Sequence, residues 1–133
     1  IPIIKDERIQ EISFGVYEGL SFGKDTYNIP DPDFMNFFTK PHEYVVPSGG
    51  ESFQEVLERT GEFLEALKGD SRYKEKTVLL STHGCALKAL LANIKGTPLP
   101  EFWGEGVHKN CAVSVVELAD GNYRVLEEGK VYY

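Results

Sequence analysis

The longest regular pattern of apolar positions lies in the middle of the chain. Six positions there share the three-to-four-residue spacing of a helix: Phe53, Val56, Leu57, Thr60, Leu64 and Leu67. This pattern predicts one helix from about Phe53 to Lys68 with a single buried stripe. Ser52 followed by Glu55 fits a capping box at its start, and Ser48 with Glu51 offers a competing register. Glu51 and Ser52 are therefore expected to cap the helix rather than to take part in chemistry.

A second pattern joins a strand directly to a helix. Residues 77–81 form a short, largely apolar run, Thr-Val-Leu-Leu-Ser, which predicts a buried strand. A stretch rich in alanine and leucine follows, and it predicts a helix from Ala86 to Ile94 that stops at Gly96 and Pro98.

The remaining patterns predict shorter elements. Strands are expected from Ala112 to Leu118 and from Tyr123 to Glu128, because an Asp-Gly pair between two β-rich runs is a strong hairpin signal. A short helix is expected from Asp31 to Phe38, capped by Asp31 and with Pro32 in its first position. Its aromatic side chains are expected to pack on the core, and a lid over a pocket is the alternative. Ile1 to Ile4 is expected to be extended, and Gly15 to Gly23 to be a loop.

The strand-to-helix junction at His83 and Gly84 carries the first candidate chemistry. In open α/β sheets, ligands bind outside the carboxyl ends of the strands. The amino end of a helix offers unpaired N–H groups and a partial positive charge, which suit a phosphate. A phosphoryl group is therefore expected beside His83, although a single histidine after a strand is also compatible with an ordinary loop residue.

Glu11 is the second candidate. It lies among Ile9, Ile12 and Phe14, just before a turn marked by Gly15. A carboxyl group in partly apolar surroundings holds a proton more readily, as a general acid must. On composition alone, an ordinary exposed glutamate at a strand end is the favoured interpretation.

Three segments in order resemble the histidine phosphatase superfamily, which includes phosphoglycerate mutases and many small phosphatases. The matching pieces are Glu11–Gly15 with Glu18–Gly19, Gly50–Ser52 with Arg59, and Ser81–Gly84. The resemblance extends over nearly the whole chain. It implies an α/β fold, a three-layer sandwich with a mostly parallel sheet flanked by helices, of which residues 1–133 form the C-terminal portion of a single domain.

One part of the family pattern is missing from these residues. The family opens with an Arg-His-Gly motif whose histidine is the nucleophile, whereas the histidines here are His42, His83 and His108. The N-terminal part of the domain is therefore expected to be absent from the sequence. The resemblance makes His83 the second histidine, which together with Gly84 binds the transferring phosphoryl group, and it makes Glu11 the catalytic acid.

The resemblance implies a phosphomonoester hydrolase that forms a phosphohistidine on a small phosphorylated metabolite, without cofactor or metal. Phosphoglycerate mutase-type phosphoryl transfer is one alternative, and a non-catalytic relative that binds phosphorylated ligands is another. Phe22, Tyr27 and Asn110 are candidate substrate-binding residues. A homodimer is left open.

Composition narrows the class of partner. The 133 residues carry a net charge of −7, which argues against nucleic acid as a partner. The chain lacks the roughly 18 consecutive apolar residues of a membrane span, so no membrane partner is expected. Cys85 and Cys111 suggest free thiols and a cytoplasmic location. Lys88 and Lys109 are expected to lie on the solvated surface.

Overall fold

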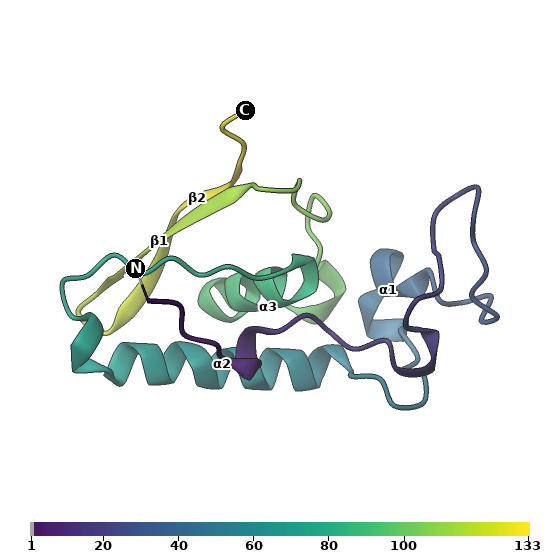
Figure 1. Ribbon diagram of the computed structural model, residues 1–133, viewed down its shortest axis with the longest axis horizontal. Helices are drawn as coiled ribbons and strands as arrows, with labels where there is room; N and C mark the ends of the chain where they lie inside the picture. Colours follow the sequence, from purple (N-terminus) through teal and green to yellow (C-terminus); the bar gives the residue numbers. More distant parts are fainter. Residues whose placement is uncertain (1) are drawn as a thin grey trace.

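The computed structural model describes residues 2–133 and places two helices beside a β-hairpin (Figure 1). Helix α2 spans Phe53–Gly69 and helix α3 spans Gly84–Lys95. Strands β1, Val113–Ala119, and β2, Asn122–Lys130, form the hairpin. Helix α3 packs against α2 on one side and against β2 on the other, so it is the central element of the molecule.

Helix α2 forms where the apolar pattern predicts it. The Ser52 hydroxyl accepts from the N–H of Glu55 at 3.1 Å, and the Glu55 carboxylate accepts from the N–H of Ser52 at 2.7 Å, which completes the capping box. The competing register is wrong, and so is the expected capping role of Glu51. The Glu51 carboxylate instead pairs with Arg59, two turns along the helix, at 2.8 Å.

Helix α3 also forms as predicted, and Gly96 ends it in the left-handed region at φ +68°. Lys109 is exposed, as expected, but the prediction for Lys88 is wrong. Lys88 is only 6% exposed, and its ammonium group lies 3.4 Å from the carboxylate of Glu128 on β2. The same carboxylate accepts from Lys95 at 2.7 Å, so a buried charge on α3 is compensated by the hairpin.

The C-terminal hairpin is confirmed, with Asp120 and Gly121 both at positive φ in its turn. It is the one sheet within residues 2–133, and its two strands are antiparallel. This part of the chain is therefore a mixed α/β structure, and it does not display the mostly parallel three-layer sandwich.

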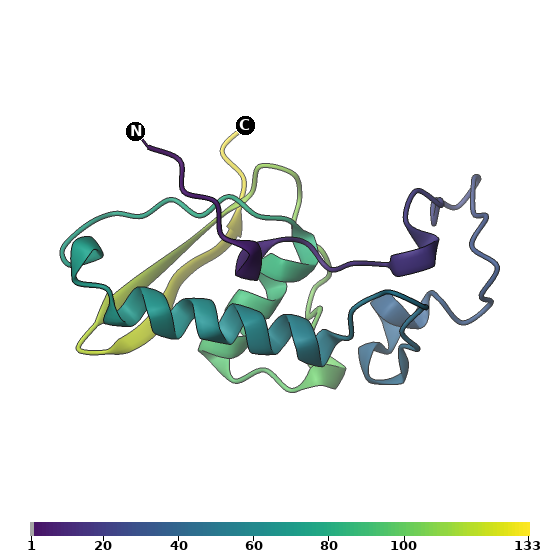
Figure 2. The ribbon, with the colours of Figure 1, turned by 60° about the horizontal axis from the view of Figure 1, so that its bottom comes forward.

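The strand expected at residues 77–81 is not formed. Within the described structure, no backbone N–H or C=O group of residues 77–82 makes a hydrogen bond to another backbone group. A strand needs a neighbour to satisfy its backbone groups, and none lies beside this segment. Figure 2 shows the segment as a long unpaired stretch that leads into the start of α3.

The aromatic segment before α2 packs on the core, which confirms the structural interpretation over a lid. Its helix is shorter than predicted, because residues 32–35 form turns and α1 covers only Asn36–Thr39. Phe34 and Phe37 are buried, and the Trp103 indole N–H donates to the carbonyl of Phe37. No helix in the described residues is both long and apolar enough to cross a bilayer.

Tyr44 sits at the edge of this aromatic cluster and allows a test of the packing. Its hydroxyl oxygen is buried and has no hydrogen-bond partner within residues 2–133. Burial raises the pKa of Tyr44 to about 12. Because an unfolded tyrosine ionises near 10, the unfolded state gains from ionisation above that pH and Tyr44 lowers stability there.

We expect Tyr44→Phe to raise the free energy of unfolding at pH 7 by about 1 kcal/mol, since it removes an unsatisfied buried hydroxyl. It should also weaken the loss of stability above pH 10. Urea unfolding of both proteins at pH 7 and pH 10.5 checks this. A loss of stability at pH 7 would show that the hydroxyl has a partner.

Candidate active site

The carboxylate of Glu11 lies at the amino end of α3. Its Oε2 atom accepts from the backbone N–H of Cys85 at 3.0 Å, and its Oε1 atom accepts from that of Ala86 at 2.9 Å. Oε1 also accepts from the N–H of Ile12 at 2.9 Å. Two segments more than 70 positions apart in the sequence are thus joined at the point where both were predicted to carry chemistry.

His83 and Gly84 form the first turn beside this carboxylate. His83 is the N-cap residue of α3, and its side chain is exposed and makes no capping hydrogen bond. The N–H of Gly84 has no hydrogen-bond partner among the described residues. A Cβ atom at Gly84 would lie 3.0 Å from Val107 and 3.8 Å from Glu11 Oε2, so a side chain there would crowd the approach to both.

The amino end of α3 is less open to an anion than the sequence suggested. Glu11 occupies the N–H groups of Cys85 and Ala86, and the N–H of Gly84 is left free for a ligand. A free N–H, an exposed imidazole and a carboxylate therefore converge on one small region. Such a set can hold a phosphoryl oxygen and exchange a proton with an adjacent one.

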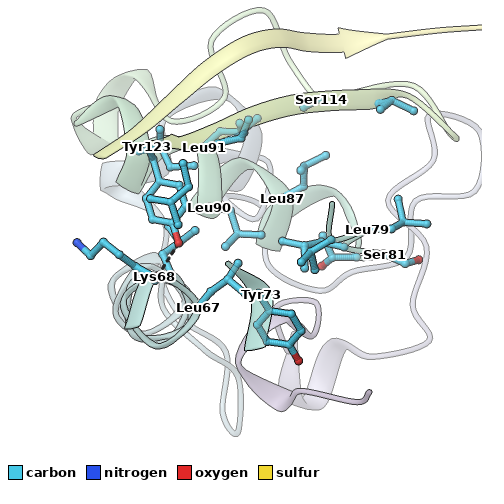
Figure 3. A pocket seen from close by; sticks show the side chains of 18 of the residues that line it. Leu67, Lys68, Tyr73, Leu79, Ser81, Leu87, Leu90, Leu91, Ser114 and Tyr123 are labelled. Carbon is cyan, nitrogen blue, oxygen red and sulfur yellow. Dashed lines mark hydrogen bonds between the residues drawn. The ribbon is translucent and has the colours of Figure 1, made fainter. Parts of the chain in front are cut away.

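An apolar groove that His83 helps to line runs along α3, and Figure 3 shows part of its lining. It has a volume of about 1150 Å³ and lies between α3, the hairpin and the unpaired residues 77–83. Leu87, Leu90 and Leu91 point into it from α3. Tyr123 on β2 lines its far end, where its hydroxyl donates to the carbonyl of Leu64 at 2.6 Å.

The three candidate substrate-binding residues are not gathered in one place. Asn110 is exposed and lines the groove together with His83. Phe22 and Tyr27 lie in the loop before α1, away from the groove lining. There the Phe22 ring packs 5.5 Å from that of Phe38, and the Tyr27 hydroxyl donates to the carbonyl of Asp31 at 2.9 Å.

Cys85 is close to Glu11 but is unsuited to nucleophilic chemistry. It is 2% exposed, and burial, with a smaller effect from the Glu11 charge, raises the pKa of its thiol. In the described residues, no group of three or more histidine, cysteine, aspartate or glutamate side chains is arranged to hold a metal ion.

Comparison with known proteins decides the family. The model of the histidine phosphatase superfamily (branch 1) matches residues 1–130. The chain belongs to this superfamily. Phosphoserine phosphatase 1 of Hydrogenobacter thermophilus is 29% identical over 96% of the chain, and the 2,3-bisphosphoglycerate-dependent phosphoglycerate mutase of Staphylococcus carnosus is 27% identical over 90% of it. The solved structure of Bacillus stearothermophilus YhfR matches 99% of the chain with a TM-score of 0.86 and 37% identity.

The histidine phosphatase relatives are longer than this chain. The matched region covers 58% of the Hydrogenobacter phosphatase, 62% of the Staphylococcus mutase and 63% of YhfR. The chain therefore spans only about three fifths of the length of these relatives.

Sequence reasoning missed two supporting residues, Glu51 and Arg59. Both belong to the segments that resemble the family, but Glu51 was expected to cap a helix and Arg59 was given no role. Their spacing of eight was the available signal, because it places Arg59 two turns into α2 on the side of Glu51.

Proposed function

We propose that this chain carries the acid–base and phosphate-binding groups of a phosphomonoester hydrolase that works through a phosphohistidine. The observation that carries the proposal is the meeting of Glu11, His83 and the free N–H of Gly84 at the amino end of α3. The small phosphorylated substrate would place its phosphoryl oxygens on His83 and Gly84 and its ester oxygen towards Glu11.

In the first step, a histidine nitrogen attacks phosphorus and the bond from phosphorus to the ester oxygen breaks. That histidine belongs to the family's Arg-His-Gly motif, which lies outside these 133 residues. Glu11 gives its proton to the departing oxygen, which leaves as a neutral alcohol. The charged form of His83 donates a hydrogen bond to the phosphoryl oxygens, where negative charge gathers.

In the second step, water attacks phosphorus and the bond from phosphorus to the histidine nitrogen breaks. The Glu11 carboxylate takes the proton from the water, and inorganic phosphate leaves. The N–H groups of Cys85 and Ala86 hold the two carboxylate oxygens of Glu11 at the amino end of α3, beside the place proposed for the phosphoryl group.

Hydrolysis is favoured over mutase activity. A mutase must retain and reposition a bisphosphorylated intermediate, which calls for an extended segment over the site. Only a moderate stretch separates Gly19 from Gly50, and its aromatic side chains pack together in the cluster around α1. The name of the Hydrogenobacter relative makes O-phosphoserine the first substrate to test.

We extend the proposal to the mostly parallel sheet that the family resemblance implies. Residues 77–82 have unpaired backbone groups and border an apolar groove, and the relatives are longer than this chain. A strand from a further segment would fill the groove, pair with residues 77–82 and extend the sheet towards the mostly parallel three-layer form. It would also cover Leu79, which is 88% exposed.

Two measurements on the natural protein test the proposal. We expect its intact mass to exceed 14.9 kDa, and we expect it to release phosphate from O-phosphoserine and to be labelled on histidine. Acid-labile, base-stable labelling during turnover would identify the phosphohistidine. A mass of 14.9 kDa with binding but no release of phosphate would favour the non-catalytic alternative, and isomerisation of phosphoglycerate would favour the mutase.

A further inference from the structure

We propose that Arg59 and Glu51 form a clamp that positions the Glu11 carboxylate for proton transfer. This inference rests on the proposed role of Glu11. It concerns two residues whose hydrogen bonds go to each other and to the backbone of residues 8–13, and not to His83 or to the amino end of α3. They act on Glu11 through its backbone.

Arg59 holds the carbonyl side of the segment. From its place on α2, its Nη1 atom donates to the carbonyls of Arg8 at 2.9 Å and of Gln10 at 2.8 Å. Its Nη2 atom donates to the carbonyl of Glu11 itself at 3.4 Å. One guanidinium group therefore spans the backbone before and at the proposed acid, which a lysine ammonium group cannot do.

Glu51 completes the clamp on the other side of Glu11. Its carboxylate accepts from the N–H of Ser13 at 3.1 Å, and its own N–H donates to the carbonyl of Ser13 at 2.9 Å. The same carboxylate binds Arg59 in a two-pronged pair at 2.8 and 3.0 Å. The two side chains are 15% and 23% exposed, so the pair is largely shielded from solvent.

The clamp connects the two helices of the core through Glu11. The backbone on either side of Glu11 is fixed to Arg59 on α2 and to Glu51 just before α2, while its carboxylate is bound to α3. The direction of the carboxylate is therefore set by both helices. A misplacement of about 1 Å at a catalytic group can cost roughly a hundredfold in rate, so loss of the clamp should appear as defective proton donation.

The test compares two substrates in the complete natural protein. We expect Arg59→Gln to lower kcat/KM for an alkyl phosphate such as O-phosphoserine by roughly 10- to 100-fold, and for 2,4-dinitrophenyl phosphate by less than about threefold. The value of kcat/KM reports formation of the phosphoenzyme, and only the alkyl leaving group needs a proton in that step. Arg59→Lys should recover part of the loss.

A double-mutant cycle separates positioning from a general loss of structure. Added to Glu11→Gln, Arg59→Gln should cause little further loss with the alkyl phosphate, because the group that it positions is already disabled. The clamp would be overturned if the losses in kcat/KM of the two single variants multiplied in the double variant. It would also be overturned if Arg59→Gln lowered kcat/KM equally for both substrates. Arg72→Gln is the matched control, since Arg72 makes an exposed pair with Asp70 and should have no effect.

Amide hydrogen exchange supplies a readout that does not depend on activity. In Arg59→Gln, the amides of Cys85 and Ala86 should exchange at least tenfold faster, while that of Leu91 on the same helix should not change. Unchanged protection of Cys85 and Ala86 would overturn the clamp even in an inactive protein. If Arg59→Gln does not fold, Glu51→Gln can replace it, because that variant keeps the three contacts from Arg59 to backbone carbonyls. It should show the same faster exchange of Cys85 and Ala86, with a smaller increase in rate. An inactive wild-type protein would contradict the proposed function alone.

Discussion

His83→Ala should reduce kcat/KM for an aryl phosphate by about 10²- to 10³-fold, the usual result of removing one donor to a developing oxyanion. Folding should be nearly unaffected. The His83 side chain is exposed and makes no capping bond, and its backbone carbonyl, which accepts from the N–H of Leu87 at 2.9 Å, is retained by alanine. The change in unfolding free energy should stay within about 0.5 kcal/mol.

Steady-state kinetics and thermal unfolding of the same preparations check this. His42→Ala is the matched control, because His42 is also exposed but lies in the short 3-10 helix after α1. It should leave activity and stability unchanged. Full activity of His83→Ala would remove His83 from the site, whereas an unfolded variant would show that His83 has a structural role that its contacts do not reveal.

Local signals in the sequence predicted most of the elements around this site. The capping box at Ser52, the glycine stop at Gly96 and the Asp-Gly turn of the hairpin each depend on a few adjacent residues, and all three form as predicted. The motif segments also led to Glu11 and His83, and the structure brings these two regions together.

The failures share a dependence on residues far away in the sequence. Lys88 was expected in solvent, but helical spacing could not reveal that Glu128 on β2 would compensate its charge. Residues 77–81 have the composition of a strand, but strand formation requires a partner, which their own sequence cannot supply. Glu51 was expected only to cap α2, because the contacts that Arg59 and Glu51 make to residues 8–13 depend on the path of a segment far away in the sequence.

Glu11→Gln should have the second large effect, and its size should depend on the leaving group. For O-phosphoserine we expect kcat/KM to fall by about 10²- to 10⁴-fold, the usual contribution of a general acid. For 2,4-dinitrophenyl phosphate the loss should be much smaller, since that leaving group departs without a proton. Equal slowing of both substrates would argue against proton donation by Glu11.

Glu11→Gln should also lower the free energy of unfolding, and this loss of stability must be separated from the loss of proton donation. The NH₂ group of a glutamine would face the backbone N–H of Cys85 or Ala86, so one of these two hydrogen bonds is lost. The favourable negative charge at the amino end of α3 is lost as well. Together these losses should lower the free energy of unfolding by about 1–3 kcal/mol. Glu18→Gln is the control, because the Glu18 carboxylate also accepts from a backbone N–H, that of Phe14 at 2.6 Å, but is exposed and does not contact α3. We expect Glu18→Gln to lose a comparable amount of stability but to slow both substrates equally. That result would show that the leaving-group dependence of Glu11→Gln comes from the position of Glu11 beside His83.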